Sequence, residues 1–373
     1  MKSKQIFQAI EETNFLKQLL SQKKLFFVGD GESLKYIQDF SLNLNPKDSN
    51  YYYDLSANKL SNLLKGDVDI NQYQAIIVVS LIDEAALLAT VKEEISLPQI
   101  PTLRLFTDIF INLLCQQPLL KPIAQDTKKP HTAYAILTTP RSGSTYLCEL
   151  LDSTKIAGHP QEHLRLAAQE LSLYCNFNYL TLLDNLMTYR TSDNGVFGTK
   201  IISHFLFELK QTKPNFKQIF KSIDKFILLV RKDKVAQAVS LVVAQKTEVW
   251  HLHKNGNAQE KDSDYQSKLE NIIIDDALLD NVEQKYNFIV RQETRLKELL
   301  ANNQVEPLIV VYEDILANCP EQIKGILDFL AIAQPEEYTM QIKSGLKKMP
   351  SRLSQEIIQQ YRQKKTPSIS IQR

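Results

Sequence analysis

The sequence predicts an α/β protein made of two domains, each with a parallel sheet flanked by helices. Short runs rich in β-branched and aromatic residues alternate with helical patterns from residue 20 to residue 120, and the alternation resumes after residue 131. Strands that alternate with helices form parallel sheets, because each crossover lays its helix on a face of the sheet. The stretch "KPIAQDTKKPH" lies between the two runs and contains two prolines, so it is the expected linker. We therefore expect domains at 1–125 and 131–373.

The first domain is expected to be a small Rossmann-like unit. A charged amphipathic helix opens the chain, and "KKLFFVGDGESLKYIQDF" follows as strand, glycine-containing turn and helix. Further strands are expected in "SNYYYDLS", "YQAIIVVSLID" and "PTLRLFTDIF". Gly29 and Gly31 form only part of the dinucleotide fingerprint G-x-G-x-x-G, because Leu34 stands at the third glycine position. A tight turn in a scaffold or partner-docking domain is therefore favoured over a dinucleotide site.

The second domain opens with an apolar run, Tyr134 to Leu137, which leads into a polar turn and a helical stretch. Later strands are expected in "GVFGTKIISHFLFEL", "KFILLVRKD" and "PLIVVYEDI". The main later helices are expected in "LRLAAQELSLY", "KVAQAVSLVVAQKTEVW" and the long segment Asp275–Asn302. That long helix suits either a homodimer interface or packing inside the domain.

The composition argues against several classes of protein. Forty-four basic and 43 acidic side chains give a net charge of +1, whereas general binders of nucleic acid or acidic membranes carry a basic excess. The N-terminal segment is charged throughout, unlike a signal peptide, and no run approaches the ~20 apolar residues of a membrane span. The four cysteines form no C-x-x-C pair, which favours free thiols in a reducing compartment. We expect a cytoplasmic protein.

The segment "TTPRSGSTYL" predicts an anion site between the first strand of the second domain and the helix after it. The first amides of a helix have no partner within the helix, and its dipole attracts negative charge. The turn itself consists of Arg141, Ser142, Gly143, Ser144 and Thr145. A simple helix cap needs one hydroxyl, so this cluster favours anion binding, with phosphate, sulfate and carboxylate all open. The P-loop pattern G-x-x-x-x-G-K-[ST] is absent, which argues against a nucleotide kinase or hydrolase.

Two further segments carry candidate site residues. In "FILLVRKDKVAQAVS", Arg231 ends a strand and Ser240 lies nine residues later in a helix. Parallel strands end at one edge of a sheet, so Arg231 is expected on the same rim as Arg141, although a surface ion pair explains it equally well. In "AGHPQEHLR", Glu162 follows a turn and is a candidate proton acceptor. On these residues alone, a solvated carboxylate at a helix start is the better explanation of Glu162.

Taken together, four segments resemble the sulfotransferase superfamily, and within it the bacterial branch typified by trehalose 2-sulfotransferase. The segments are "YAILTTPRSGSTYLCELLDSTKIAGHPQEHL", "NGVFGTK", "LLVRKDKVAQAVSLVVAQKTEVW" and "VVYEDI", in the order and spacing of that family. The resemblance implies a parallel α/β sheet related to that of the P-loop nucleotide kinases. It further implies metal-free transfer of a sulfuryl group from 3′-phosphoadenosine 5′-phosphosulfate (PAPS). The acceptor would be a hydroxyl or amine of a carbohydrate or small natural product, and 3′,5′-adenosine bisphosphate (PAP) would be released.

The resemblance also implies roles for individual residues. The 5′-phosphosulfate loop would consist of Arg141, Ser142, Gly143, Ser144 and Thr145. Arg231 and Ser240 match the residues that bind the 3′-phosphate, and Glu162 matches the carboxylate proposed as general base. Lys200 matches the lysine of the family's G-x-K segment. Sulfuryl transfer resembles phosphoryl transfer, so the main task of the protein is to hold fixed donors against the charge of the transition state.

Several positions depart from the pattern of that branch. His204 has no counterpart there and is a rival base by analogy with eukaryotic cytosolic sulfotransferases, although a buried, hydrogen-bonded histidine is the simpler explanation. The C-terminal segment keeps a Tyr-Arg pair but has Ile357 at the expected tryptophan position. Lys348 or Arg352 is the expected contact to the 3′-phosphate, and the sequence does not favour either.

Two smaller signals lie beyond Ser240. Trp250, the single tryptophan of the chain, is expected in the core rather than against an acceptor. His251 and His253 form an H-x-H pair with no convincing third ligand, so a surface turn is favoured over a metal site. The alternative function is a non-catalytic sulfonucleotide-binding or sensing protein, in which the loop binds its anion but Glu162 does no chemistry.

Overall fold

The computed structural model describes most of the 373-residue chain. The described residues are 7, 15–22, 24–45, 49–55, 68–81, 83–95, 99–114, 118–122, 129–163, 183, 186–187, 190–211, 216–252, 258–334, 342–346 and 351–365. Several predictions therefore lie outside the described residues, namely those for two of the four cysteines (Cys115 and Cys175), for His253 and Lys348, and for the helix at 164–174.

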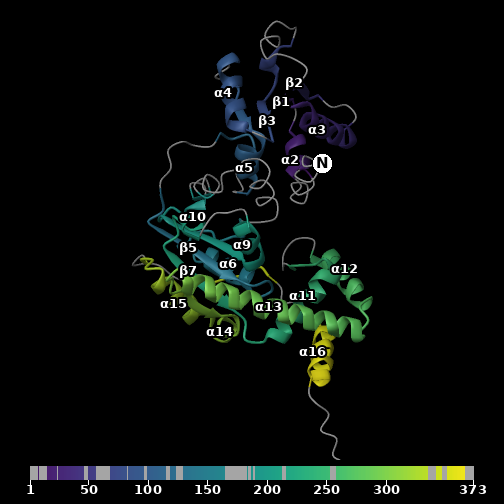
Figure 1. Ribbon diagram of the computed structural model, residues 1–373, viewed down its shortest axis with the longest axis vertical. Coiled ribbons are helices and arrows are strands. Elements are labelled where there is room, and N and C mark those ends of the chain that lie inside the picture. Colours follow the sequence, from purple (N-terminus) through teal and green to yellow (C-terminus); the bar gives the residue numbers. More distant parts are fainter. Residues whose placement is uncertain are drawn as a thin grey trace, which may run out of the picture. The chain divides into compact units, whose positions relative to one another are not determined.

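The chain divides into two compact units, each with its own four-stranded parallel sheet (Figure 1). The first unit comprises Met1–Lys129, His163–Thr191 and Glu208–Ile219, and the second comprises Pro130–Glu162, Ser192–Phe207 and Phe220–Arg373. One sheet lies within predicted domain 1–125 and the other within 131–373. The domain boundaries themselves stay a prediction.

The sheet of the first unit has the strand order β2-β1-β3-β4. Its strands are β1 (Leu25–Gly29), β2 (Tyr51–Asp54), β3 (Ala75–Val79) and β4 (Thr102–Arg104). The helical elements are α2 (Phe15–Leu20), α3 (Gly31–Leu44), η2 (Ile70–Gln72), α4 (Glu84–Glu94), the π-helical η3 (Leu105–Ile109) and α5 (Phe110–Leu114). Every residue of β1 and β3 is buried, as expected for central parallel strands that helices cover on both faces.

The turn between β1 and α3 is tight. A single residue, Asp30, joins the two elements, and its carboxylate accepts a hydrogen bond from the amide of Ser33 at 3.0 Å, which caps the helix. A Cβ atom at Gly29 would lie 2.3 Å from the carbonyl oxygen of Val79, so β1 and β3 approach too closely there for a side chain. The close approach of β1 and β3 therefore explains why a glycine stands at position 29, without any bound ligand.

The sheet of the second unit has the order β6-β5-β7-β8, again entirely parallel. Its strands are β5 (Thr132–Thr138), β6 (Val196–Ile202), β7 (Lys225–Val230) and β8 (Leu308–Val311). The chain leaves β5 for a neighbour on one side, β6, and returns to a neighbour on the other side, β7. Ligands of open parallel sheets bind at such a switch point, beyond the carboxyl ends of the strands.

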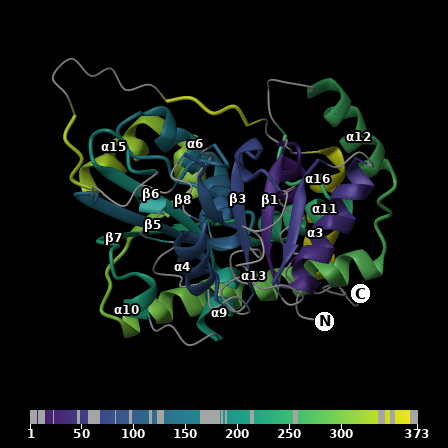
Figure 2. The same cartoon turned by 90° about the horizontal axis from the view of Figure 1, so that it is seen from above.

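Helices complete the second unit (Figures 1 and 2). They are α6 (Ser144–Ser153), α11 (Lys234–Thr247), α12 (Ala258–Glu270), α13 (Asp276–Asn302), α14 (Tyr312–Ala317), α15 (Cys319–Phe329) and α16 (Arg352–Lys365). Between β6 and β7 the chain forms α9 (Ser203–Gln211), which begins in this unit, and α10 (Phe216–Ile219), which belongs to the first unit. The sheet and α6 share one apolar core with α15.

A second apolar cluster joins α11, α13 and α16, which lie against one another. The long helix predicted at Asp275–Asn302 is α13, with Asp275 as its N-cap, and its apolar face packs inside the unit. Ile357, which stands at the expected tryptophan position, is fully buried in this cluster. Burial of one such side chain contributes roughly 1.5–3 kcal/mol, so α16 is anchored without the tryptophan.

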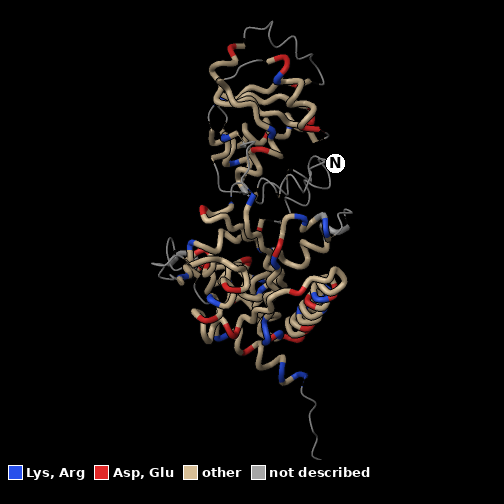
Figure 3. The backbone as a smooth tube through the Cα atoms, turned by 90° about the vertical axis from the view of Figure 1, so that its left-hand side faces the viewer, with Lys and Arg blue, Asp and Glu red and all other residues tan. Residues whose placement is uncertain are grey.

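The described residues of both units carry charges of both signs. Basic and acidic positions are interspersed along both units (Figure 3), in keeping with the net charge of +1. Among these residues, no helix combines the length and apolarity needed to cross a membrane. The two described cysteines, Cys148 and Cys319, are free thiols, and burial raises the pKa of Cys148 to about 12.

Candidate active site

The predicted anion loop lies at the carboxyl end of β5, between that strand and α6. Its backbone is unusual, because Arg141 (φ +61°) and Gly143 (φ +88°) both adopt left-handed conformations. For arginine this conformation is strained and needs surrounding contacts to hold it. Ser142 supplies one such contact, since its fully buried Oγ lies 2.5 Å from Thr138 Oγ1. The Ser142 side chain is therefore directed into the protein, and its predicted part in anion binding would fall to its main chain.

Gly143 is fixed by its neighbours as well as by its backbone angle. A Cβ atom at this position would lie 2.1 Å from Cδ2 and 2.4 Å from Cε2 of Tyr312. Gly143 is also the N-cap of α6, so no side chain of its own caps the first amides of the helix. Those amides, which include Ser144 and Thr145, are the groups that bind anions at helix N-termini.

Arg141 contacts the helix that carries Ser240. Its Nε donates a hydrogen bond to Ser240 Oγ at 3.0 Å, and its Nη1 donates to the carbonyl oxygen of Trp250 at 2.5 Å. Two residues that the sequence predicted separately, 99 positions apart, are thus bonded to each other. Burial lowers the pKa of Arg141, and the nearby charge of Arg231 acts in the same direction. A partly buried guanidinium that stays charged favours an anionic partner.

Arg231 lies at the end of β7, on the same rim as Arg141. Its Nη1 donates a hydrogen bond to the Arg141 carbonyl oxygen at 3.3 Å, and its Cζ lies 5.1 Å from the centroid of the Tyr312 ring. Its Nε is 3.8 Å from Glu313 Oε1, a distance at which charges attract but no hydrogen bond forms. The strand-end ion pair that the sequence offered as an alternative is therefore present, and it lies inside the candidate site.

Glu162 is brought to the site by a short bridge to β6. Gln161 pairs with Thr199 in parallel register, and its carbonyl oxygen accepts a hydrogen bond from the amide of Lys200 at 2.9 Å. Glu162 Oε2 consequently lies 2.9 Å from Lys200 Nζ, and the two side chains are only 15% and 6% exposed. Lys200 Nζ also donates to Thr145 Oγ1 at 3.3 Å. The explanation of Glu162 as a solvated carboxylate is wrong, because it is a largely buried member of an ion pair next to the anion loop.

His204 is at the second position of α9, directly after β6. Burial lowers its pKa, whereas the charge of Glu162 acts to raise it, so both candidate bases belong to one region of the unit. Within the described part of the chain, His204 Nδ1 is buried and has no hydrogen-bond partner. The simpler explanation, a fully hydrogen-bonded core histidine, does not hold for that nitrogen.

Gln237 is a site residue that the sequence analysis missed. It is fully buried, and its Nε2 donates hydrogen bonds to Thr139 Oγ1 at 2.9 Å and to the Pro140 carbonyl oxygen at 2.8 Å. Residues three positions apart lie on one face of a helix, so Gln237 faces the loop together with Ser240. A polar residue on the apolar side of "KVAQAVSLVVAQ" is the signal that would have identified it.

The prediction that Trp250 packs in the core is wrong, because its side chain is 46% exposed. Helix α11 ends at Thr247, its C-cap Glu248 adopts a left-handed conformation, and the chain beyond it reaches the predicted anion loop. The Trp250 carbonyl oxygen binds Arg141, and His251 Nε2 is 3.4 Å from Thr145 Oγ1. His251 is exposed, as expected for a surface turn. The described residues include no group of three side chains suited to a metal ion.

Arg352 and Arg362, both in α16, have different partners. Arg352, one of the two residues expected at the 3′-phosphate, has an exposed side chain that pairs with Glu356 at 2.8 Å. Arg362 Nη2 instead lies 2.9 Å from Asp233 Oδ2, at the turn that follows Arg231. Of these two arginines, Arg362 contacts the β7–α11 turn.

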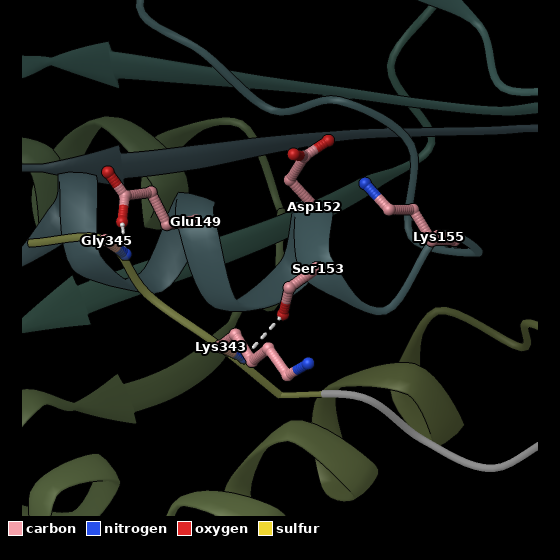
Figure 4. Close-up of a pocket in the computed structure, with 6 residues that line it drawn as sticks. All are labelled: Glu149, Asp152, Ser153, Lys155, Lys343 and Gly345. Atoms are coloured by element: carbon pink, nitrogen blue, oxygen red, sulfur yellow. Dashed lines mark hydrogen bonds between the residues drawn. The ribbon is translucent and has the colours of Figure 1, made fainter. Parts of the chain in front are cut away.

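A separate hollow of about 350 Å³ lies along the C-terminal half of α6 (Figure 4). Its lining residues are Glu149, Asp152, Ser153, Lys155, Lys343 and Gly345. Glu149 Oε2 accepts a hydrogen bond from the amide of Gly345 at 2.9 Å, and Ser153 Oγ accepts one from the amide of Lys343 at 2.9 Å. None of the predicted site residues lines this hollow, because they gather at the N-terminal end of the same helix.

The chain is similar to several known proteins. The family described as Stf0 sulphotransferase matches residues 133–364. Trehalose 2-sulfotransferase of Mycolicibacterium smegmatis is 23% identical over 269 residues, which are 62% of this chain and 94% of that protein. Trehalose 2-sulfotransferase of Mycobacterium tuberculosis (strain Erdman) is 23% identical over 233 residues, or 52% of this chain and 82% of that protein.

Two solved structures also show similarity. The sulfotransferase domain from the Synechococcus PCC 7002 olefin synthase has 19% identity and a TM-score of 0.29, and that from the curacin biosynthetic pathway has 16% identity and a TM-score of 0.29. Each alignment covers 57% of this chain and 77% of the other. The family match, by contrast, spans more than half of the chain and includes every residue of the site. The chain therefore belongs to the Stf0 sulfotransferase family and is a sulfotransferase enzyme.

Proposed function

We propose that the protein transfers a sulfuryl group from PAPS to a hydroxyl group of a carbohydrate or a small natural product, or to an amine. The observation that carries this proposal is the meeting of Arg141, Arg231 and Ser240 at the carboxyl edge of the sheet. Two guanidinium groups and a row of helix amides at one rim suit a ligand with two separate anionic groups. PAPS has two such groups, the 5′-phosphosulfate and the 3′-phosphate.

The proposed reaction is an in-line displacement at sulfur. A bond forms between the acceptor oxygen and sulfur, while the bond from sulfur to the bridging phosphate oxygen breaks and leaves PAP. The loop amides and Arg141 would stabilise the charge that develops on the leaving phosphate oxygen. The proton of the acceptor hydroxyl would pass to the carboxylate of Glu162, which becomes a carboxylic acid. No metal ion is needed in this scheme, since the charge is balanced by fixed cationic side chains.

Lys200 supports the assignment of Glu162 as the base. The ion pair at 2.9 Å fixes one carboxylate oxygen of Glu162 and leaves the other available for a proton. Because Lys200 also contacts Thr145, the same ammonium group joins the base to the loop that would hold the donor. Such an arrangement orients the base before the acceptor arrives, which lowers the entropic cost of reaction.

Trp250 is our candidate for the acceptor side of the site. Its main chain is held by Arg141, whereas its indole is substantially exposed. Exposed aromatic rings at binding sites offer a rigid apolar face with little loss of conformational entropy. Relatives named trehalose 2-sulfotransferase favour a carbohydrate as the first acceptor class to test. The cytoplasmic location and the homodimer stay predictions.

The first experiment compares nucleotides as stabilising ligands. At about 100 times its dissociation constant, PAP should stabilise the fold by about 2.7 kcal/mol and raise Tm accordingly. AMP, which lacks the 3′-phosphate, should give a smaller increase at the same concentration. Thermal unfolding in the presence of PAP, AMP and ATP measures this directly. Equal stabilisation by ATP would contradict the sulfonucleotide assignment.

A second experiment distinguishes a catalytic sulfotransferase from a protein that only binds the sulfonucleotide. Mass spectrometry of cell extract incubated with isotopically labelled PAPS and the protein should reveal acceptors that gain one sulfuryl group. A protein that binds PAP yet produces no such product would instead match the sensing alternative.

A further inference from the structure

The dipeptide Tyr312-Glu313 lies between the two anion-binding elements, and the reaction proposed above assigns it no part. Its position follows from strand register. β7 and β8 are parallel with Val230 opposite Val311, so the residues that follow them, Arg231 and Tyr312, leave the sheet next to each other. This register places the start of α14 against the carboxyl edge where the ligand is proposed to bind.

The Tyr312 ring contacts both anion-binding elements at once. Its Cδ2 and Cε2 atoms occupy the space that a side chain at Gly143 would need, 2.1 and 2.4 Å from the position of a Cβ atom. Its centroid lies 5.1 Å from Cζ of Arg231, within the range of a cation–π interaction. One rigid ring therefore packs against both Gly143 of the loop and the guanidinium group of Arg231.

Glu313 holds the turn that carries Arg231. Its carboxylate accepts hydrogen bonds from the amides of Lys232 at 2.9 Å and Asp233 at 3.2 Å. Hydrogen bonds to a charged acceptor are stronger than neutral ones, and two of them fix the orientation of a short turn. The same carboxylate attracts Arg231 Nε from 3.8 Å.

These contacts form a closed circuit that links the loop, Arg231 and the Tyr312-Glu313 dipeptide. Arg231 Nη1 donates to the carbonyl oxygen of Arg141, two residues before Gly143, and Gly143 touches Tyr312. The next residue, Asp314, takes no part in this circuit. Its carboxylate pairs with the Lys232 ammonium at the surface, where the side chain of Asp314 is 44% exposed and that of Lys232 is 62% exposed. Asp314 is thus a matched control for Glu313.

We propose that Tyr312 and Glu313 are positioning residues that set the distance and angle between the 5′-phosphosulfate loop and Arg231. They would thereby make the protein select nucleoside 3′,5′-bisphosphates over nucleotides with a single 5′-phosphate. The inference rests on the proposed function, since it concerns recognition of the same donor. Neither residue needs to touch the nucleotide for this effect.

The test uses Glu313→Gln, Tyr312→Leu, Tyr312→Phe and the control Asp314→Asn in the full chain. The measured quantity is the ratio of the dissociation constants of AMP and PAP, obtained by calorimetric titration. Loss of a hydrogen bond to the charged acceptor should lower this ratio about tenfold in Glu313→Gln. Tyr312→Leu should lower it about fivefold through loss of the ring face. Tyr312→Phe, which keeps the ring, and Asp314→Asn, which loses an exposed pair, should stay within about twofold of wild type.

A purely structural role would reduce stability without changing this ratio, so thermal unfolding is recorded for each variant. If Tyr312→Leu does not fold, Glu313→Gln alone decides, since it is isosteric. A wild-type preference for PAP that persists within about twofold in Glu313→Gln overturns the inference and leaves the proposed function intact. A wild-type protein without preference for PAP overturns the proposed function, and the inference with it.

Discussion

The chemistry proposed for Glu162 depends on one buried neighbour. The Lys200 ammonium lies 2.9 Å from the carboxylate, and both side chains are largely shielded from water. A buried ion pair adds little net stability, but removal of one partner leaves an uncompensated charge. The pair is therefore better explained by the orientation it gives Glu162 than by stabilisation of the fold.

Glu162→Gln is expected to lower kcat by about 10²- to 10⁴-fold, because an amide cannot accept the proton of the acceptor. The dissociation constant of PAP should hardly change, since the proposed scheme places Glu162 against the acceptor and not against the nucleotide. Single-turnover assays with PAPS measure the first effect, and calorimetric titration with PAP measures the second. Glu149→Gln, a change of the same type on the far half of α6, is the control.

A double variant tests the role of Glu162 further. Glu162→Gln leaves the Lys200 charge buried without its partner, so the double variant with Lys200→Met should restore stability but not turnover. Burial lowers the pKa of His204, so its imidazole is neutral at pH 7 and able to accept a proton. An unchanged kcat in Glu162→Gln would therefore transfer the role of base to His204 or to water.

At the scale of elements, the loop is held by the helices around it. Helix α11 contributes Gln237 and Ser240 from one face, and the start of α14 contributes Tyr312. Contacts with these neighbours hold the strained backbone at Arg141 and surround Gly143 closely. The loop is thus a product of the packing around it as much as of its own sequence.

Gly143→Ala is expected to destabilise the protein and to weaken PAP binding at least tenfold, roughly the effect of 1.4 kcal/mol. The added methyl group meets the Tyr312 ring, and the backbone angle of +88° disfavours any side chain. Gly325→Ala is the control, because nothing lies within 4 Å of a Cβ atom there. That control, within α15, should stabilise the fold by about 0.4–1 kcal/mol, which chemical denaturation measures.

The stability of the first unit should depend on pH through one buried carboxylate. The buried Glu84 carboxylate at the start of α4 accepts hydrogen bonds from the amides of Phe106 and Thr107, and burial raises its pKa to about 7. In the unfolded chain its pKa returns to the ordinary value of 4.5, so between these two pH values the folded state binds more protons. Stability from this group is therefore full below pH 4.5 and is lost as the pH rises towards 7.

The expected loss is about 3 kcal/mol at most. Hydrogen exchange of the Phe106 and Thr107 amides, compared at pH 5 and pH 7 after correction for the intrinsic rate, reports it locally. Glu84→Gln removes the titration and should abolish the difference between the two pH values. A difference that persists in this variant would show that another group titrates.

At the scale of the whole molecule, two parallel sheets of similar size have different features at their carboxyl edges. In the first unit, the tight turn at Gly29 is explained by the contact between β1 and β3, and an acidic residue caps the helix that follows. In the second unit, the corresponding turn carries Arg141 and a glycine cap. The proposed anion site therefore belongs to the second unit, where positive charge and uncapped amides coincide.

Local sequence patterns were enough to predict the class of the fold and the residues of the proposed anion loop. Alternating strand and helix patterns are local signals, so β5, β6, β7, β8 and α13 could be placed from them. Arg231 was predicted on the rim of Arg141 because parallel strands end at one edge, and the two residues are hydrogen-bonded there. These inferences succeeded because they depend on chain periodicity and on the direction of strands.

The neighbours of each side chain, by contrast, follow from how the elements pack in three dimensions. Ser142 was expected to face a ligand, yet its hydroxyl bonds to Thr138, and Trp250 was expected in the core, yet it is exposed. Gln237 and Tyr312 gave little signal in the sequence, because their importance arises from contacts about 100 and 170 positions away, with Thr139 and Gly143. Such contacts depend on strand register and on where each helix begins and ends, and local sequence patterns do not specify either.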